Sequence, residues 1–261
     1  MKKTFLLSCL MLAAMPVMAA YTGRVYVDKN KNGVFDPGEK TWAGIKVSDG
    51  LNVVETAADG SFTLPGHERE RFIFITTPSG YKTFNRHYHK IEEKQSGYDF
   101  GLMPYSGRIR KDGSHKYIHI ADTEIFNTEN HEDWVNNVRD YARNEQAAFI
   151  IHTGDICYEK GLKAHIKLMN TENMDCPVFY CIGNHDLVKG KYGEELFESI
   201  YGPVYYSFDA GNVHYIVTPM PGGDHAPGYT ADDVCRWLKN DLAHIRPGTP
   251  VVVFNHDLLT Y

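Results

Sequence analysis

Polar residues that could bind a metal follow four predicted strands, at the point where each strand ends. In open α/β sheets, ligands bind at the carboxyl ends of the strands, so we expect these four turns to meet in one crevice. The four segments are Asp122-Thr-Glu124, Gly154-Asp155-Ile-Cys-Tyr158, Gly183-Asn184-His185-Asp186 and His256-Asp257.

Carboxylate, amide and imidazole donors together suit Fe, Mn or Zn better than Ca, and they could hold two ions that share a carboxylate. A two-metal centre activates a water, clamps phosphoryl oxygens and neutralises charge during in-line displacement. These residue types therefore favour the hydrolysis of a phosphate ester.

The elements that must position these residues alternate between strand and helix. Apolar residues at helical spacing predict helices over Thr128–Gln146 and Gly161–Asn173, and Thr230-x-x-Asp233 is a capping box that begins another helix. Repeated strand–helix units indicate a largely parallel sheet with helices on its faces. The predicted strands are Lys116–Ala121, Ala148–His152, Pro177–Ile182, Tyr205–Asp209, Val213–Thr218 and Val251–Phe254.

In their order along residues 116–261, these motifs resemble those of the calcineurin-like metallophosphoesterase superfamily. The segment that begins at Tyr205-Tyr-Ser-Phe-Asp also resembles the hairpin of its purple-acid-phosphatase branch. The resemblance implies an α/β domain built as an αββα sandwich with mixed sheets. It further implies a metallophosphoesterase that hydrolyses a phosphomonoester or phosphodiester with a water activated by two divalent or mixed-valence metals (Mn, Fe or Zn).

The resemblance also assigns roles to individual residues. Asp122 would bind the first metal, Asp155 would bridge both metals, and Asn184 and His256 would bind the second. His185 would contact the phosphate or protonate the leaving group, and Asp186 would orient it.

Two positions have open alternatives. Glu124 stands where many members have a histidine, and it is either a harder metal ligand or a surface or supporting residue. Tyr158 has the Gly-Asp-x-x-Tyr spacing of the tyrosine that binds Fe³⁺ in purple acid phosphatases, and it is either that ligand or a packing residue at the rim of the cleft. His225 lies in a Gly- and Pro-rich segment, residues 221–228, and is a weaker candidate for a substrate contact.

The final motif of the family, Gly-His-x-His, supplies one histidine to each metal and does not occur in the sequence, which ends at Tyr261. We therefore expect the domain to be incomplete at its C-terminus and the chain as given to have low activity.

Residues 21–104 contain short β-branched and aromatic runs separated by turns, a pattern that predicts a β-sandwich. A twelve-residue segment within it has the spacing of a calcium loop, with glycine at the sixth position. The expected Ca²⁺ ligands are Asp28, Asn30, Asn32, the Val34 carbonyl, Asp36 and Glu39. The segment resembles the calcium-loop B domains of bacterial adhesins, and residues 57–63 resemble a turn of carboxypeptidase-regulatory-like sandwiches. Residues 105–115 would be the linker to the second domain, residues 116–261.

Residues 1–20 have a basic start, an apolar stretch and small residues at the end, which is typical of a secretory signal peptide. This predicts export to the periplasm or the cell surface. The apolar stretch is too short to span a bilayer comfortably, and no other segment approaches 18 consecutive apolar residues. Four cysteines follow the leader, and the sequence does not decide whether they pair or remain free: Cys157, Cys176, Cys181 and Cys235.

The 27 Lys and Arg against 33 Asp and Glu give a net charge of −6, without a basic block that would neutralise nucleic-acid phosphates. The expected partner is a phosphorylated small molecule or an envelope component. The alternative function is a calcium-ordered binding protein of the cell envelope with an inert phosphoesterase-like domain.

Overall fold

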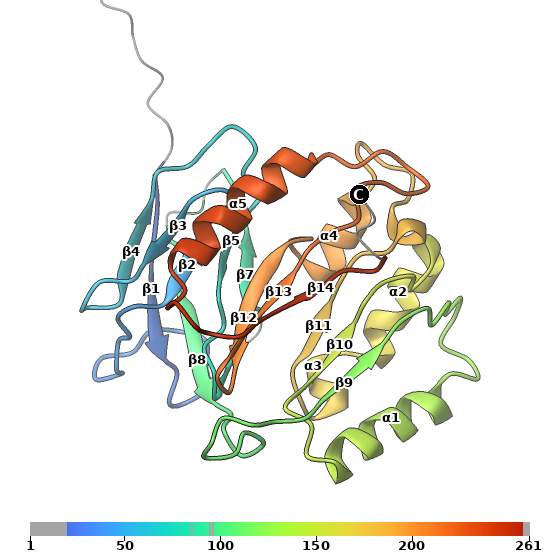
Figure 1. Ribbon diagram of the computed structural model, residues 1–261, viewed down its shortest axis with the longest axis horizontal. Helices are drawn as coiled ribbons and strands as arrows, with labels where there is room; N and C mark the ends of the chain where they lie inside the picture. Colours follow the sequence, from blue (N-terminus) through green and yellow to red (C-terminus); the bar gives the residue numbers. More distant parts are fainter. Residues whose placement is uncertain (1–19, 85, 94, 96, 258–261) are drawn as a thin grey trace, which may run out of the picture.

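A computed structural model describes residues 20–257, except 85, 94 and 96. Apart from its last residue, the predicted leader lies outside the described residues. Figure 1 shows a β-rich part, built from the beginning of the chain, beside a part in which helices flank two further sheets. We call residues 21–104 the β-module and residues 116–257 the α/β domain. Within the described residues, no helix has the length and apolar character needed to cross a membrane.

The β-module is a sandwich of two four-stranded sheets, in the orders β4-β1-β8-β6 and β3-β2-β5-β7. Val25 and Leu102 from the first sheet, and Val47 and Ile75 from the second, are fully buried in one shared core. The predicted β-sandwich is thus confirmed. Its strands are β1 (Tyr21–Val27), β2 (Lys46–Ser48), β3 (Val53–Glu55), β4 (Ser61–Leu64), β5 (Phe72–Ile75), β6 (Tyr81–Thr83), β7 (Tyr88–Lys90) and β8 (Phe100–Pro104).

The α/β domain contains two three-stranded sheets that pack face to face. One is parallel, in the order β11-β10-β9, and the other has the order β12-β13-β14, with β12 antiparallel and β14 parallel to β13. Aromatic rings fill the space between them: the Phe208 ring stacks on Phe179 with centroids 3.7 Å apart and meets Phe149 edge-on at 5.0 Å. The strands are β9 (Tyr117–Ile120), β10 (Phe149–His152), β11 (Val178–Tyr180), β12 (Tyr206–Ala210), β13 (Val213–Val217) and β14 (Val251–Phe254).

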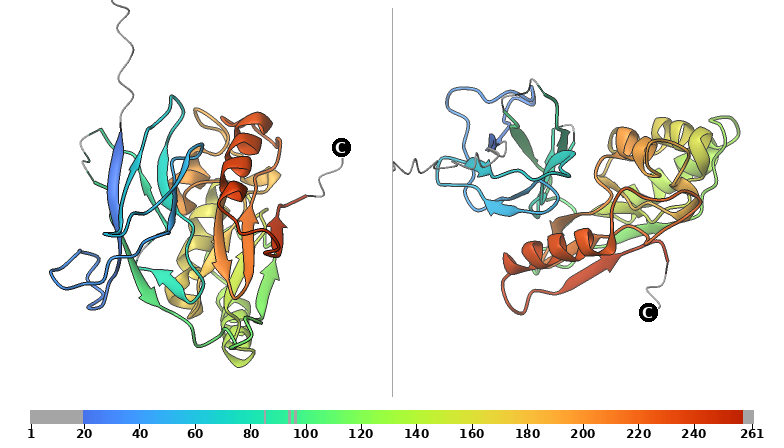
Figure 2. Two further views of the ribbon diagram at one scale, coloured as in Figure 1. Left: turned by 60° about the vertical axis from the view of Figure 1, so that its left-hand side comes forward. Right: turned by 90° about the horizontal axis from the view of Figure 1, so that it is seen from above.

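Helices cover the outer faces of both sheets, which completes the expected αββα sandwich with mixed sheets (Figures 1 and 2). One predicted helix, Gly161–Asn173, is two helices in the structure because the Asn170 side chain accepts the Glu172 and Asn173 N–H groups and begins a new turn. The parallel sheet carries α1 (Glu132–Asn144), α2 (Tyr158–Leu168), α3 (Thr171–Met174) and α4 (Glu195–Tyr201), and the mixed sheet carries α5 (Ala231–Ala243).

The β-module joins the α/β domain through a shared core. Phe72 and Phe74 of β5 belong to the same buried cluster as Trp237 of α5 and the rings between the domain's sheets. The Asp209 N–H also donates to the Thr77 carbonyl at 2.9 Å. These contacts fix the module against β12 and α5.

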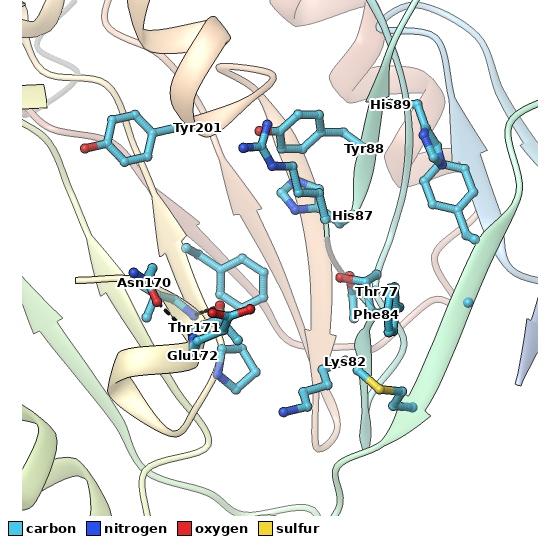
Figure 3. A pocket seen from close by; sticks show the side chains of 18 of the residues that line it. Thr77, Lys82, Phe84, His87, Tyr88, His89, Asn170, Thr171, Glu172 and Tyr201 are labelled. Atoms are coloured by element: carbon cyan, nitrogen blue, oxygen red, sulfur yellow. Dashed lines mark hydrogen bonds between the residues drawn. The ribbon is translucent and has the colours of Figure 1, made fainter. Parts of the chain in front are cut away.

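On another side, the two parts are separated by a cavity of about 640 Å³. Figure 3 shows His87 and Tyr88 of the module on one wall, and Asn170, Glu172 and Tyr201 of the domain on the other. The packed junction between the two parts therefore includes β5, β12 and α5 and leaves this cavity beside it.

Candidate active site

Three side chains with metal-binding atoms meet where strands of both domain sheets end. Asp122 follows β9, Asp155 follows β10 and His256 follows β14. One ligand atom from each lies within 4.8 Å of the other two. Among the described residues, this is the only group of three or more His, Cys, Asp or Glu side chains that could hold a metal ion.

His256 presents a lone pair toward this cluster. Its Nδ1 lies 2.8 Å from the Thr153 carbonyl, which can only accept, so Nδ1 carries the proton. Nε2 is then the unprotonated nitrogen, and it lies 3.4 Å from Asp155 Oδ2. A hydrogen bond from the other ring nitrogen to a carbonyl fixes the tautomer of a metal-binding histidine.

The turns that carry the two aspartates have an uncommon backbone conformation. Asp122 and Asp155 have φ values of 54° and 51°, in the left-handed region that non-glycine residues seldom adopt. The Asp122 N–H donates to the Gly154 carbonyl at 3.0 Å, which ties one turn to the other. A Cβ on Gly154 would lie 2.5 Å from the Gly183 nitrogen, so only glycine permits this close approach of two backbones.

A buried histidine supports both turns. His152, at the end of β10, is fully buried, and burial holds its pKa well below the ordinary value, so its ring is neutral. Its Nδ1 accepts the Gly154 N–H at 3.2 Å, which leaves the proton on Nε2 to donate to Thr123 Oγ1 at 3.0 Å. His152 matches none of the motifs found in the sequence. Its position at a strand end, directly before Gly154-Asp155, was the available signal.

His185 lies at the edge of the cluster, in the short helix η1 (Asn184–Asp186) that follows β11. The backbone N–H of His185 donates to Asp155 Oδ1 at 3.1 Å, and the ring Nε2 lies 3.9 Å from Asp155 Oδ2. Nδ1 donates to Asp224 Oδ2 at 2.9 Å, and this hydrogen bond raises the pKa of His185. Asp224 was not singled out from the sequence because its segment carries no periodic pattern.

Asp186, which was expected to orient His185, contacts backbone N–H groups instead. Its two carboxylate oxygens accept the N–H groups of Cys157 at 2.9 Å and Gly183 at 3.0 Å. Burial raises the pKa of Asp186 to about 6 despite these hydrogen bonds. Asp186 therefore ties the turn after β10 to the turn after β11, whereas Asp224 contacts the imidazole of His185.

The remaining predicted residues lie around this centre. The Asn184 carbonyl accepts the Asp224 N–H at 3.1 Å. Glu124 is exposed; its N–H approaches the Asp155 carbonyl at 3.4 Å, and its carboxylate is not part of the three-residue cluster. The Tyr158 ring is 46% exposed and lies 5.4 Å from the His185 ring.

A hollow of about 240 Å³ lies beside His185. Both Tyr158 and His225, two residues with uncertain roles in the sequence analysis, line it. The lining residues are Tyr158, Glu159, Leu187, Val188, Lys189, Asp224 and His225.

The donor set at the end of β9, β10 and β14 fits the predicted metals. Two carboxylates and one imidazole nitrogen are borderline-hard donors of the kind that Mn, Fe and Zn accept. Asp122, Asp155 and His256 could hold an ion directly.

The predicted calcium loop uses its carboxylates for internal hydrogen bonds. Asp28 accepts the Gly33 N–H at 2.8 Å, and Glu39 accepts the Lys29 and Asp36 N–H groups at 2.8 and 3.0 Å. Both the Asn30 and the Asn32 amide donate to Asp36 Oδ2, at 2.7 and 2.8 Å, and Val34 is exposed. Calcium binding stays a prediction. All four cysteines left open by the sequence analysis have free thiols: Cys157, Cys176 and Cys181 are buried and Cys235 is exposed.

Comparisons with known protein families agree with this geometry. Residues 29–105 match the model described as the N terminal of calcineurin-like phosphoesterase. Residues 115–260, more than half of the chain, match the calcineurin-like phosphoesterase model. A search of curated proteins found no significant match. The chain belongs to the calcineurin-like phosphoesterase family.

Proposed function

We propose that this protein hydrolyses a phosphomonoester or phosphodiester, with two transition-metal ions (Mn, Fe or Zn) that activate a water. The observation that carries the proposal is the meeting of Asp122, Asp155 and His256 within 4.8 Å, with His185 at the edge of the cluster. Carboxylates, an imidazole ligand and a second imidazole with a raised pKa are the groups that metal-assisted phosphate hydrolysis requires.

Each residue has a task in this reaction. Asp122, Asp155, Asn184 and His256 would hold the ions, which supply the activation of water and neutralise phosphate charge when bound. The Nδ1–H of His185 is engaged by Asp224, so the proton that His185 can deliver is the one on Nε2. We assign this proton to the leaving-group oxygen.

The organic part of the substrate would occupy the hollow beside His185. Lys189 and His225 offer cationic or hydrogen-bonding groups there, and Tyr158 offers an aromatic face. This lining favours a leaving group that is flat or carries additional polar groups, without selecting one phosphorylated compound.

An Asp155→Asn variant tests the proposal. The variant keeps the size of the side chain but loses charge, so we expect loss of bound metal and a decrease of about 100-fold or more in the hydrolysis of 4-nitrophenyl phosphate. Asp140→Asn is the matched control, because Asp140 lies exposed on α1 and forms ion pairs with the neighbouring Arg139 and Arg143. Metal content by inductively coupled plasma mass spectrometry and turnover are measured on the same samples.

An Asp155→Asn protein that retains both its metal and its turnover would refute the proposal. A wild-type protein that binds no transition metal and shows no turnover, but melts at a higher temperature with calcium, would support the inert, calcium-ordered alternative instead.

A further inference from the structure

Arg71, directly before β5 in the β-module, contacts two buried carboxylates of the α/β domain. Its Nη2 lies 2.8 Å from Glu194 Oε1 and 2.7 Å from Glu198 Oε1, and its Nε lies 3.1 Å from Glu198 Oε1. Glu194 is fully buried and Glu198 is 5% exposed. The guanidinium also lies over the Tyr192 ring, 4.6 Å from its centroid. Arg71 is thus the cation that allows a carboxylate charge at this buried position.

Glu194 also contacts a loop of the active site, residues 221–228. Both of its carboxylate oxygens accept the N–H of Gly228, at 3.1 and 2.9 Å. The neighbouring Gly193 N–H donates to the Ala226 carbonyl at 2.8 Å. The C-terminal end of the 221–228 loop is therefore hydrogen-bonded to Glu194, which Arg71 contacts, and to the adjacent Gly193.

The middle of the same loop is hydrogen-bonded to His185, the proposed catalytic histidine. The Asp224 N–H donates to the Asn184 carbonyl at 3.1 Å, and Asp224 Oδ2 accepts the Nδ1–H of His185 at 2.9 Å. Three residues separate Asp224 from Gly228. A displacement of Gly228 is therefore transmitted to Asp224 over a short stretch of chain.

We propose that Arg71 is a positioning residue of the active site. It holds Glu194 in place, Glu194 holds the 221–228 loop, and the loop holds Asp224 against His185. The β-module then contributes to the positioning of the catalytic residues. The kinetic consequence rests on the proposed phosphoesterase function, whereas the mechanical link from Arg71 to the loop does not.

Hydrogen–deuterium exchange of the full chain tests the mechanical link without reference to activity. In an Arg71→Met variant, Glu194 loses its cation, and we expect the amides of residues 222–229 to exchange about tenfold faster. Peptides from β1 and β8 should keep their protection. Arg71→Lys retains the charge and should restore most of the protection of the loop.

Arg69→Met is the matched control. Arg69 also reaches from the β-module to the α/β domain, with Nη1 2.7 Å from Asp233 Oδ2, but Asp233 caps the start of α5 at Thr230 and also pairs with Arg236. Its removal should leave exchange in residues 222–229 unchanged.

The kinetic arm uses two substrates that differ in leaving group. Phenolate is a more basic leaving group than 4-nitrophenolate and depends more on protonation by a general acid. Misalignment of His185 should therefore slow the hydrolysis of phenyl phosphate more than that of 4-nitrophenyl phosphate. With the manganese-loaded protein, we expect Arg71→Met to decrease kcat about tenfold for phenyl phosphate and less than about threefold for 4-nitrophenyl phosphate. Values of KM should change little, and Arg71→Lys should recover most of kcat.

Unchanged exchange in residues 222–229 of Arg71→Met would overturn the proposal. So would an equal loss of kcat for both substrates, because that indicates a general structural defect. If Arg71→Met does not fold, the double variant with Glu198→Gln removes one of the two buried carboxylates and is measured instead. Failure of both variants to fold also overturns the proposal. A wild-type protein without turnover would refute the phosphoesterase function, while the exchange experiment would still decide the link.

Discussion

The buried histidine His214 links stability to pH through a network that joins the β-module to the α/β domain. Its Nδ1 lies 2.7 Å from Asp209 Oδ1 and its Nε2 lies 2.8 Å from Asp241 Oδ2. The module contributes to the same network, because Lys46 Nζ lies 3.6 Å from Asp209 Oδ2 and Asp241 accepts from Ser207, which contacts Thr76. Replacing His214 by glutamine removes the ionisable group at the centre.

The pKa of His214 gives the magnitude. Burial lowers this pKa, but the hydrogen bonds to Asp209 and Asp241 more than offset burial and raise it from 6.5 to about 9. A pKa difference of about 2.5 units sets an upper limit of about 3 kcal/mol on the contribution of His214 protonation to the free energy of unfolding. Solvent screening at the partly exposed Asp209 reduces this contribution to about 2 kcal/mol. Because the folded state binds the proton more tightly, this stabilisation is complete below pH 6.5 and is lost as the pH rises through about 9.

Urea unfolding across this pH range tests the prediction. Between pH 6.5 and pH values above 9, the wild type should lose about 2 kcal/mol more stability than His214→Gln. His244→Gln is the control, because His244 also contacts the module, 3.2 Å from Glu55 Oε1, but is partly exposed. Parallel stability profiles for the wild type and His214→Gln would refute the reasoning.

Three further predictions concern the active site and the loop of the module. Asp224→Asn should decrease kcat for phenyl phosphate by about tenfold with unchanged metal content, because it weakens the contact to His185; unchanged kcat would contradict this. Calcium at about 1 mM should raise the melting temperature by several degrees, and Asp36→Asn should abolish the shift; equal melting with calcium and with a chelator would exclude the site. Tyr158→Phe should leave bound iron unchanged, because the ring lies exposed against His185; loss of a visible charge-transfer band in the variant would instead identify Tyr158 as an iron ligand.

Residues that directly follow a strong strand pattern could be placed from the sequence. Asp122, Asp155 and His256 each follow an apolar run, and the rule that strand ends share one edge of a sheet brings them together. Residue patterns also gave the β-sandwich and the alternation of strands and helices, because β-branched runs and helical spacing are strong in those segments, whereas the αββα layers were expected from the family resemblance.

What depends on long-range contacts could not be predicted. The strands β6 and β7 are three residues each and mix polar with aromatic side chains, so their pairing comes from neighbouring strands. Asp224 meets His185 only because the 221–228 loop is held by hydrogen bonds to Asn184 and Glu194. Arg71 reaches Glu194 across 123 positions of sequence, for which no local pattern exists.

The central claim is that Asp122, Asp155 and His256 form a transition-metal centre. Crystals of the protein soaked in manganese, with diffraction data collected at the manganese absorption edge, test it most directly. We predict anomalous peaks beside Asp155, with one within bonding distance, about 2.0–2.3 Å, of a carboxylate oxygen of Asp155 and of another ligand from this cluster. An absence of anomalous signal among these three side chains, in a protein that still hydrolyses phosphate esters, would contradict the account.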